Sequence, residues 1–280
     1  MQLAVIGMGL IGGSAALDLK RAGFAERIIG VGRRPETAAE ALRLGLVDAV
    51  APLEEAVAAA DLTILAVPVD AALPLLPRVL DQVGEGQTVT DMCSTKRTLM
   101  AAVAGHPRRA RFVGSHPMAG TENSGPRAAQ PDLFRGKIGI LCDTEASAPD
   151  AVAAVEGLYR ALGMRLVRMD AARHDLHTAY VSHLSHAVSY ALALTVLDKE
   201  RDEAAIFNLA GGGFASTARL AKSGAPMWTP IFMNNQDHLL EALDAYRGHL
   251  DALREAIARG DVPALNDLIA RANDIRRILG

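Results

Sequence analysis

The 280-residue sequence predicts an α/β fold, with a doubly wound parallel sheet in its first part and an all-helical domain after it. From residue 1 to about residue 170, short β-branched apolar runs alternate with segments whose apolar residues recur at helical spacing. This alternation is typical of a parallel sheet that helices cover on both faces. After residue 170 the strand patterns stop and only long helical patterns follow. We therefore expect two domains, residues 1–170 and residues 171–280.

The predicted strands are brief and lie between glycine, proline or charged residues. Four come first, at residues 3–6, 27–31, 62–67 and 88–91, and later runs at residues 111–114, 139–143 and 165–169 extend the same sheet. Helical spacing occurs at residues 14–22 and 35–44, and again at residues 174–199, 230–253 and 262–278. Pro263 suits the first turn of the last helix, where its missing N–H costs no hydrogen bond.

Composition and charge exclude several classes of protein. With 50% hydrophobic and 22% charged residues, the chain differs from disordered and fibrous sequences. Its 29 basic and 32 acidic residues give a net charge of −3, which argues against a polyanion-binding surface based on bulk charge. The first residues do not form a signal peptide, and no apolar stretch reaches the roughly 18 residues of a membrane span. Two cysteines cannot build a disulfide framework, so we expect a cytoplasmic protein.

A glycine pattern at the first strand–helix turn predicts a dinucleotide site. The sequence Gly7-Met8-Gly9-Leu10-Ile11-Gly12 directly follows an apolar strand and runs into a helix. In this context Gly7 permits the tight turn, Gly9 lets the backbone approach a pyrophosphate, and Gly12 lets the helix pack against the strand. These glycines, with Leu10 and Ile11, are therefore candidate contacts of a nicotinamide dinucleotide in a Rossmann-type domain. The alternative is a glycine-rich turn without a ligand.

The residues after the second strand favour NADP over NAD. An NAD site usually places an acidic residue there, which accepts a hydrogen bond from the ribose 2′-hydroxyl. This chain has Gly32, Arg33 and Arg34 instead, and two guanidinium groups can pair with a 2′-phosphate. The alternative is that Arg33 stacks on the adenine of either cofactor while Arg34 is solvated. Pro68 follows the strand at residues 62–67 and is expected at the crevice where the strand order reverses.

Two polar loops follow later strands and are expected at the same edge of the sheet. One is Gly114-Ser115-His116-Pro117-Met118-Ala119-Gly120-Thr121-Glu122, and the other is Asp91-Met92-Cys93-Ser94-Thr95-Lys96. Ligands bind at the carboxyl edge of such sheets. His116, Ser94 and Lys96 are therefore candidates for a site there. The alternative for His116 is a histidine satisfied within the core.

The long helix at residues 174–199 carries four histidines but does not predict a metal site. At about 100° per residue on a straight helix, His174 and His177 point away from His183 and His186, so no single cluster forms. One face of this helix is polar, as expected of a face that lines a cleft, and it comprises Ser182, His186 and Ser189. Another face is expected to be core and comprises His177, Val181, Leu184, Val188, Leu192 and Thr195.

A glycine run further along the chain is the last chemical signal. Three consecutive glycines, residues 211–213, let the backbone pass close to a ligand. Arg219 follows on a short predicted helix, shortly before Met227 and Trp228. The alternative for Arg219 is a solvated surface side chain.

Together, the order and spacing of these segments resemble the prephenate/arogenate (cyclohexadienyl) dehydrogenase family of tyrosine biosynthesis. The resemblance covers nearly the whole chain, and it rests on the dinucleotide loop, residues 91–96, His116-Pro117-Met118-Ala119-Gly120-Thr121-Glu122, Val181-Ser182-His183-Leu184-Ser185-His186, and residues 211–228. It implies a Rossmann domain, a helical domain that forms a homodimer, and an active site between them. The implied activity is that of an NAD(P)-dependent oxidoreductase. It converts prephenate or arogenate to 4-hydroxyphenylpyruvate or tyrosine, with release of CO₂.

The resemblance also implies roles for individual residues. His116 matches the histidine that takes the proton of the substrate's ring hydroxyl, and Ser94 matches a serine near that histidine and the nicotinamide. Arg219 matches the arginine that holds the ring carboxylate. Other cleft positions, which order the substrate and modulate access, are matched by Ser182, His186 and Glu122. The sequence departs from NAD-specific members at the end of the second strand, where it has Gly32-Arg33-Arg34 instead of their aspartate.

Two other classes of function are alternatives. A β-hydroxyacid dehydrogenase or imine reductase-like NADP enzyme also joins a Rossmann domain to helices. That class would be expected to use a lysine on the long helix, which has none before Lys199. A non-enzymatic NADP-sensing protein would not need His116, Ser182 and Arg219 at one site. Within the favoured family, the sequence leaves open the choice between prephenate and arogenate, and whether tyrosine inhibits.

The helical domain has more apolar residues than a domain of about 110 residues is expected to bury alone. They predict a homodimer interface, and they include Ile231, Phe232, Leu239, Leu240, Leu243 and Leu250. Besides a second copy of the chain, the expected partner is the small-molecule substrate. We expect neither a nucleic acid nor a membrane as a partner.

Overall fold

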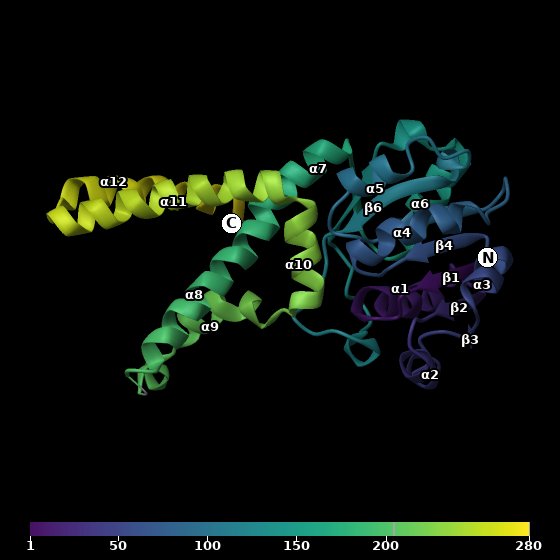
Figure 1. Cartoon of the computed structure of the whole chain (residues 1–280), viewed down its shortest axis with the longest axis horizontal. Coiled ribbons are helices and arrows are strands. Elements are labelled where there is room, and N and C mark those ends of the chain that lie inside the picture. The colour runs from purple at the N-terminus through teal and green to yellow at the C-terminus, as the bar shows by residue number, and fades with distance from the viewer. Residues whose placement is uncertain (204, 280) are drawn as a thin grey trace. The chain divides into compact units, whose positions relative to one another are not determined.

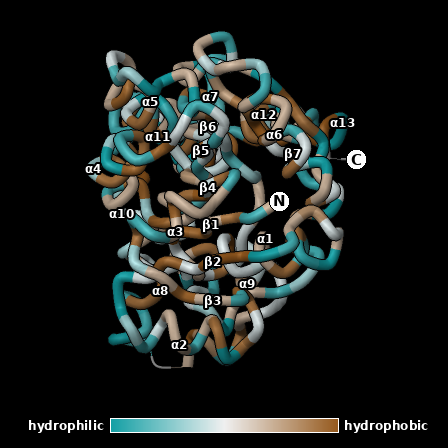
Figure 2. Tube along the Cα trace, turned by 90° about the vertical axis from the view of Figure 1, so that its right-hand side faces the viewer, coloured by the Kyte–Doolittle hydropathy of each residue, from teal (hydrophilic) through white to brown (hydrophobic). Residues whose placement is uncertain are grey.

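The computed structural model describes residues 1–203 and 205–279 and contains an eight-stranded sheet. The strand order is β3-β2-β1-β4-β5-β6-β7-β8, and Figure 2 shows the strands from β3 to β6 one above another. The strands are β1 (Gln2–Ile6), β2 (Arg27–Val31), β3 (Ala49–Val50), β4 (Leu62–Leu65), β5 (Thr88–Asp91), β6 (Phe112–Pro117), β7 (Ile138–Cys142) and β8 (Arg165–Met169). The order reverses at β1, which lies between β2 and β4, so the sheet is doubly wound.

One strand pair departs from the predicted parallel sheet. The pairs are parallel except β6–β7, in which Ser115 lies opposite Leu141. A parallel neighbour needs a crossover connection, usually a helix. Between β6 and β7 the described chain has only a loop with one short 3₁₀ turn, Pro126–Ala128, and the strand therefore turns back beside its neighbour. Strand β3 was not predicted, because two residues are too few for a periodic pattern.

Helices cover both faces of the sheet and bury an apolar layer on each. Helices α1 (Leu10–Arg21) and α6 (Pro149–Ala161) pack on one face, where Leu3, Leu19 and Val155 belong to a single buried cluster. Helices α3 (Leu53–Ala59), α4 (Val69–Leu80) and α5 (Arg97–Ala102) pack on the other, around Leu76 and Phe112. Helix α2 (Pro35–Arg43) lies beside β2 and β3. The central strands β1, β4, β5 and β6 are therefore buried between two layers, as the sequence predicted, whereas the edge strand β8 is largely exposed.

The predicted long helix exists but is interrupted by a π-turn. Helix α7 (Ala171–Thr178) passes into a π-helical turn, Ala179–His183, and then into α8 (Leu184–Glu200). Figure 1 labels α7 and α8. Asp170 begins α7 because its side chain accepts a hydrogen bond from the Arg173 amide at 2.8 Å. Two shorter helices follow, α9 (Gly212–Ala218) and α10 (Ala225–Asn234). The predicted helix at residues 230–253 is divided at Asn235, after which α11 (Gln236–Arg259) begins.

The chain forms two compact units, of which the first is Met1–Asn235 and the second begins at Gln236. The first unit holds the sheet, its helices and α7 to α10. In the second unit α11 packs against α12 (Val262–Ala272), and a last turn, α13 (Arg276–Leu279), follows. The predicted boundary at residue 170 falls between β8 and α7. Over the described residues, no helix combines the length and apolar character that a membrane span requires.

Candidate active site

The turn between β1 and α1 has the geometry that a dinucleotide requires. Gly7 has a φ of +97°, and a Cβ there would strike the backbone oxygen of Ala66. A Cβ on Gly12 would overlap the Gly7 carbonyl, so this glycine lets α1 approach the strand. Gly9 differs, because a Cβ there would meet nothing within 4 Å. Gly9 is the N-cap of α1 and provides no side-chain cap, which leaves the first N–H groups of the helix for an anion. These residues fit a pyrophosphate.

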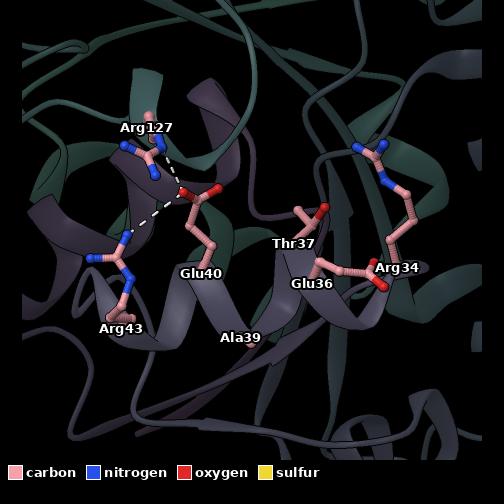
Figure 3. A pocket seen from close by; sticks show the side chains of 7 residues that line it. All are labelled: Arg34, Glu36, Thr37, Ala39, Glu40, Arg43 and Arg127. Carbon is pink, nitrogen blue, oxygen red and sulfur yellow. Dashed lines mark hydrogen bonds and ion pairs between the residues drawn. The ribbon is translucent and has the colours of Figure 1, made fainter.

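The expected adenosine end of the site is basic. Arg33 and Arg34 are exposed where β2 leads into α2, and Arg34 lines an open hollow along α2. At the other end of this hollow, Glu40 accepts a hydrogen bond from Arg127 at 2.6 Å and lies 3.7 Å from Arg43 (Figure 3). Within residues 1–203 and 205–279, Arg34 has no ion-pair partner. Its guanidinium is therefore available to an anionic ligand.

A buried ion pair shapes the loop after β5. Asp91 and Lys96 are both fully buried, and the Lys96 ammonium donates to Asp91 Oδ2. The same carboxylate accepts the Cys93 amide at 2.9 Å and, through Oδ1, the Ser115 amide at 3.0 Å. Burial alone would lower the pKa of Lys96, but the charge of Asp91 and its hydrogen bond to the ammonium, together with other nearby groups, raise that pKa. Through these bonds the ion pair holds residues 91–96 against β6. The half-buried Ser94 is therefore fixed next to the strand that carries His116.

His116 sits at the end of a chain of buried polar groups. Its Nδ1 lies 2.8 Å from Nε2 of His174, and Nδ1 of His174 lies 2.8 Å from Oδ1 of Asp175. Asp175 also accepts the backbone amides of Lys96 at 2.8 Å and Arg97 at 2.9 Å. His116 is 8% exposed, and His174 and Asp175 are fully buried. We call Asp91, Lys96, His116, His174 and Asp175 the sealed corner.

The histidines of the sealed corner are neutral at physiological pH. Burial, together with the electrostatic influence of His174, the Lys96 ammonium and His183, holds the pKa of His116 well below its usual value of 6.5. Burial also lowers the pKa of His174, against the opposing effect of the hydrogen bond that its ring donates to Asp175. A neutral imidazole has one nitrogen that can accept a proton. The geometry therefore gives His116 the chemistry of a general base.

A second group of candidate residues lies in a more exposed setting. Arg219, whose side chain is 52% exposed, donates to Glu122 at 3.1 Å. The His186 ring stacks on Trp228 with 3.4 Å between the ring centroids. Ser182 is half-buried, and its carbonyl lies 3.0 Å from His186 Nδ1. We call Glu122, Ser182, His186, Arg219 and Trp228 the open end.

The segment around Arg219 is held near α8 by one serine. Ser189 donates to the Thr217 carbonyl at 3.0 Å and accepts the Ala221 amide at 3.1 Å. Arg219 lies between these two anchored residues. The polar face predicted for the long helix thus positions the arginine.

Comparison with known proteins identifies the family. The model of the prephenate dehydrogenase nucleotide-binding domain matches residues 15–168, and that of the prephenate dehydrogenase dimerization domain matches residues 170–271. The chain belongs to the prephenate dehydrogenase family. A prephenate dehydrogenase of Lactococcus lactis is 31% identical over 99% of this chain and 77% of its own length. One of Bacillus subtilis is 32% identical over 98% of this chain and 75% of its own length.

Solved structures agree with this assignment. The prephenate dehydrogenase of A. aeolicus, in complex with hydroxyphenyl propionate and NAD⁺, has a TM-score of 0.89 and 30% identity, over 100% of this chain and 98% of that one. The arogenate dehydrogenase of Synechocystis has a TM-score of 0.77 and 31% identity, over the whole of both chains. The predicted family and the Rossmann-type domain followed by a helical domain are confirmed, and the protein is an NAD(P)-dependent oxidoreductase.

The sequence analysis did not identify three residues that the structure places among the candidate site residues. His174 and Asp175 were not assigned to the site, and Trp228 was noted only as the end of a segment. The orientation expected for His174 assumed a straight helix, but the π-turn at Ala179–His183 changes the rotation between α7 and α8. As a result, His174 and His183 are both buried, with exposures of 0% and 1%. A histidine followed by an aspartate, just after a helix cap, was the available signal.

The face of the long helix that was predicted to be core is open in this chain. Val181 is 69% exposed and His177 is exposed as well. Leu184, Val188 and Leu192 are only half-buried. The prediction was wrong because a periodic apolar face indicates only that the face packs against some surface. It does not show whether that surface belongs to the same chain.

Proposed function

We propose that this protein catalyses the oxidative decarboxylation of prephenate or arogenate, with NADP⁺ as the preferred hydride acceptor. Both substrates have a ring carbon that carries a carboxylate and, across the ring, a secondary alcohol. The observation that carries the proposal is His116, a buried neutral imidazole with its Nδ1 engaged by His174. Such a group can take a hydroxyl proton at Nε2.

The proposed step transfers a hydride from the alcohol carbon to the nicotinamide, which supplies the electron acceptor when bound. The hydroxyl proton passes to Nε2 of His116. The ring then loses CO₂ and becomes aromatic, and the proton on His116 returns to the phenolate oxygen. Arg219 holds the ring carboxylate, because its forked donors match a carboxylate better than a lysine would. Ser94 assists near His116, and Ser182, His186 and Glu122 line the approach of the substrate.

A two-by-two assay tests this proposal. The purified chain is given prephenate or arogenate, each with NAD⁺ or NADP⁺, and reduced cofactor is followed by its absorbance. We expect turnover with at least one of the two substrates and a higher kcat/KM with NADP⁺. Tight NADP⁺ binding without turnover of either substrate would favour the sensor alternative.

Preference for NADP⁺ is supported by Arg33 and Arg34, which stand where an acidic residue would repel a 2′-phosphate. The double variant Arg33→Ala/Arg34→Ala should weaken NADP⁺ binding about ten- to a hundredfold and NAD⁺ binding much less, because a charge-assisted pair is worth roughly 1.5–3 kcal/mol. Arg43→Ala is the matched control, since Arg43 lies in the last turn of α2, beside Glu40 and away from the turn that holds Arg33 and Arg34. Equal losses for both cofactors would support adenine stacking instead.

We also propose a cytoplasmic homodimer. The matching C-terminal family model describes a dimerization domain. Large apolar side chains are exposed on the helices of this chain, among them Val181, Leu194, Leu197, Leu240 and Leu250. Obligate dimers bury such surfaces in interfaces of about 2,000 Å² or more. Light scattering should give twice the chain mass, and a folded, active monomer at micromolar concentration would contradict this. The two buried cysteines, both free, suit a reducing compartment.

A further inference from the structure

The hydrogen bonds around His174 allow only one arrangement of protons. Asp175 is ionised, because hydrogen bonds from His174 and from the amides of Arg97 and Lys96 lower its pKa despite its burial. A carboxylate only accepts hydrogen bonds. Asp175 Oδ1 therefore requires a proton on Nδ1 of His174. Since His174 is neutral, its Nε2 has no proton and can only accept.

This constraint passes on to His116. The sole hydrogen atom that can lie between Nε2 of His174 and Nδ1 of His116 belongs to His116. With its proton on Nδ1, neutral His116 keeps a lone pair on Nε2. The opposite tautomer would place two lone pairs 2.8 Å apart in a buried site, with neither satisfied.

We propose that His174 and Asp175 are positioning residues, which together fix the tautomer and ring orientation of His116 so that Nε2 is its basic atom. The proposal rests on the role of His116 given under the proposed function. His174 and Asp175 both belong to α7, and they reach His116 across the boundary between the two family domains. The dehydrogenase base is therefore completed by the first helix after the nucleotide-binding domain.

The pair is itself held rigidly, as this role requires. The amides of Lys96 and Arg97 hold the Asp175 carboxylate, and the backbone carbonyl of Asp175 accepts the Asn235 side chain at 2.6 Å. The His174 carbonyl accepts the Thr178 hydroxyl at 2.9 Å. When His116 gains a proton at Nε2, its Nδ1–H keeps the bond to His174, so the new charge needs no rearrangement of the corner.

Nitrogen NMR of the wild-type protein, selectively labelled with ¹⁵N-histidine, tests the tautomer directly. His116→Asn and His174→Asn assign the two rings by the loss of their signals. We expect both rings to be protonated at Nδ1 and unprotonated at Nε2 at neutral pH. Protonation of His116 at Nε2 would overturn the proposal. This readout needs no substrate, so it separates failure of the inference from failure of the proposed activity.

Two substitutions of His174 separate positioning from packing. The side-chain NH₂ of an asparagine can take the place of Nδ1 of His174 and bond Asp175, but the side chain is too short to reach His116. A glutamine can instead place its amide oxygen where Nε2 was and accept from His116. His174→Asn should lower kcat about ten- to a hundredfold, the usual result of leaving a buried group unpartnered. His174→Gln should restore most of kcat, and KM should change little in either variant.

The controls make each result decisive. His177→Asn changes an exposed histidine on the same helix and should leave kcat, KM and the melting temperature unchanged. Equal losses of kcat in His174→Asn and His174→Gln would indicate a packing role and overturn the proposal. Wild-type kcat in His174→Asn would overturn it too. If His174→Asn fails to fold, the wild-type tautomer and the His174→Gln variant still decide.

Discussion

The sealed corner and the open end differ in how their charges and donors are satisfied. Asp91, Lys96, His174 and Asp175 are fully buried, and each one has a hydrogen-bond partner within the chain. Arg219 is half-exposed and pairs with Glu122, a residue that a bound carboxylate would have to replace. The difference indicates that the proposed base is prepared before the substrate arrives, whereas the proposed substrate-binding groups would take their working arrangement with the ligand.

Removing the base should have the largest effect. His116→Asn should lower kcat by about 10²–10⁴-fold, the usual contribution of general-base catalysis, with little change in KM. Because the pKa of His116 lies well below 6.5, wild-type kcat should stay constant through that pH and fall only in more acidic solution. The variant should lose this acid limb. Near-normal turnover with an unchanged pH profile would show that His116 only packs the loop.

At the open end, Arg219→Ala should weaken substrate binding and raise KM. Loss of a carboxylate partner costs roughly 2–5 kcal/mol. Because Arg219 is half-exposed, we expect the lower end of that range, which corresponds to a KM increase of about thirtyfold. Turnover should change little, since the carboxylate is held in both the ground state and the transition state. Lys222→Ala, which removes an exposed cation three residues away, is the control. A loss confined to kcat would contradict the assigned role.

Acid should weaken the fold through the buried histidines. Burial lowers the pKa of His183 to about 4 in the folded protein, against 6.5 when exposed. Below pH 6.5 the unfolded chain therefore binds a proton that the folded chain does not. The free energy of unfolding should fall by about 1.4 kcal/mol per pH unit from this residue until its folded pKa is reached.

His116 and His174 should add to this acid effect in the same direction, because their folded pKa values are lowered too. Urea denaturation at several pH values measures the slope. His183→Asn should make the slope shallower, whereas His249→Asn, at an exposed position, should leave it unchanged. Stability that is constant from neutral pH down to about 4 would contradict the neutral state of these histidines.

The smallest effect is expected for Glu122→Gln. The variant removes the carboxylate that pairs with Arg219, and exposed pairs of this kind are weak. KM should therefore decrease by a few-fold at most, because the substrate carboxylate no longer competes with Glu122. Steady-state kinetics at low ionic strength should show the decrease most clearly, since salt screens exposed charges. An increase in KM would mean that Glu122 binds the substrate directly.

Much of the fold could be predicted from the sequence, because the relevant signals are local. Three of the predicted strands, including Arg27–Val31, have the observed bounds, and the turn glycines lie where the predicted dinucleotide loop requires them. The antiparallel β7 and the break at Asn235 were missed, since both depend on how the chain turns and packs beyond one element. The exposed face at Val181 was misassigned because periodicity does not reveal what covers a face.

The sequence by itself determined the alternation of strands and helices, the glycine turn of the dinucleotide site and the candidates His116 and Arg219. These depend on side-chain periodicity and backbone freedom, which neighbouring residues set. Only the tertiary structure decided which groups surround His116. His174 is 58 positions away in the sequence, and Lys96, which donates its amide to Asp175, lies on the other side of His116. Packing joins these segments in a buried site, where each donor must meet an acceptor, and that requirement fixes the proton on His116.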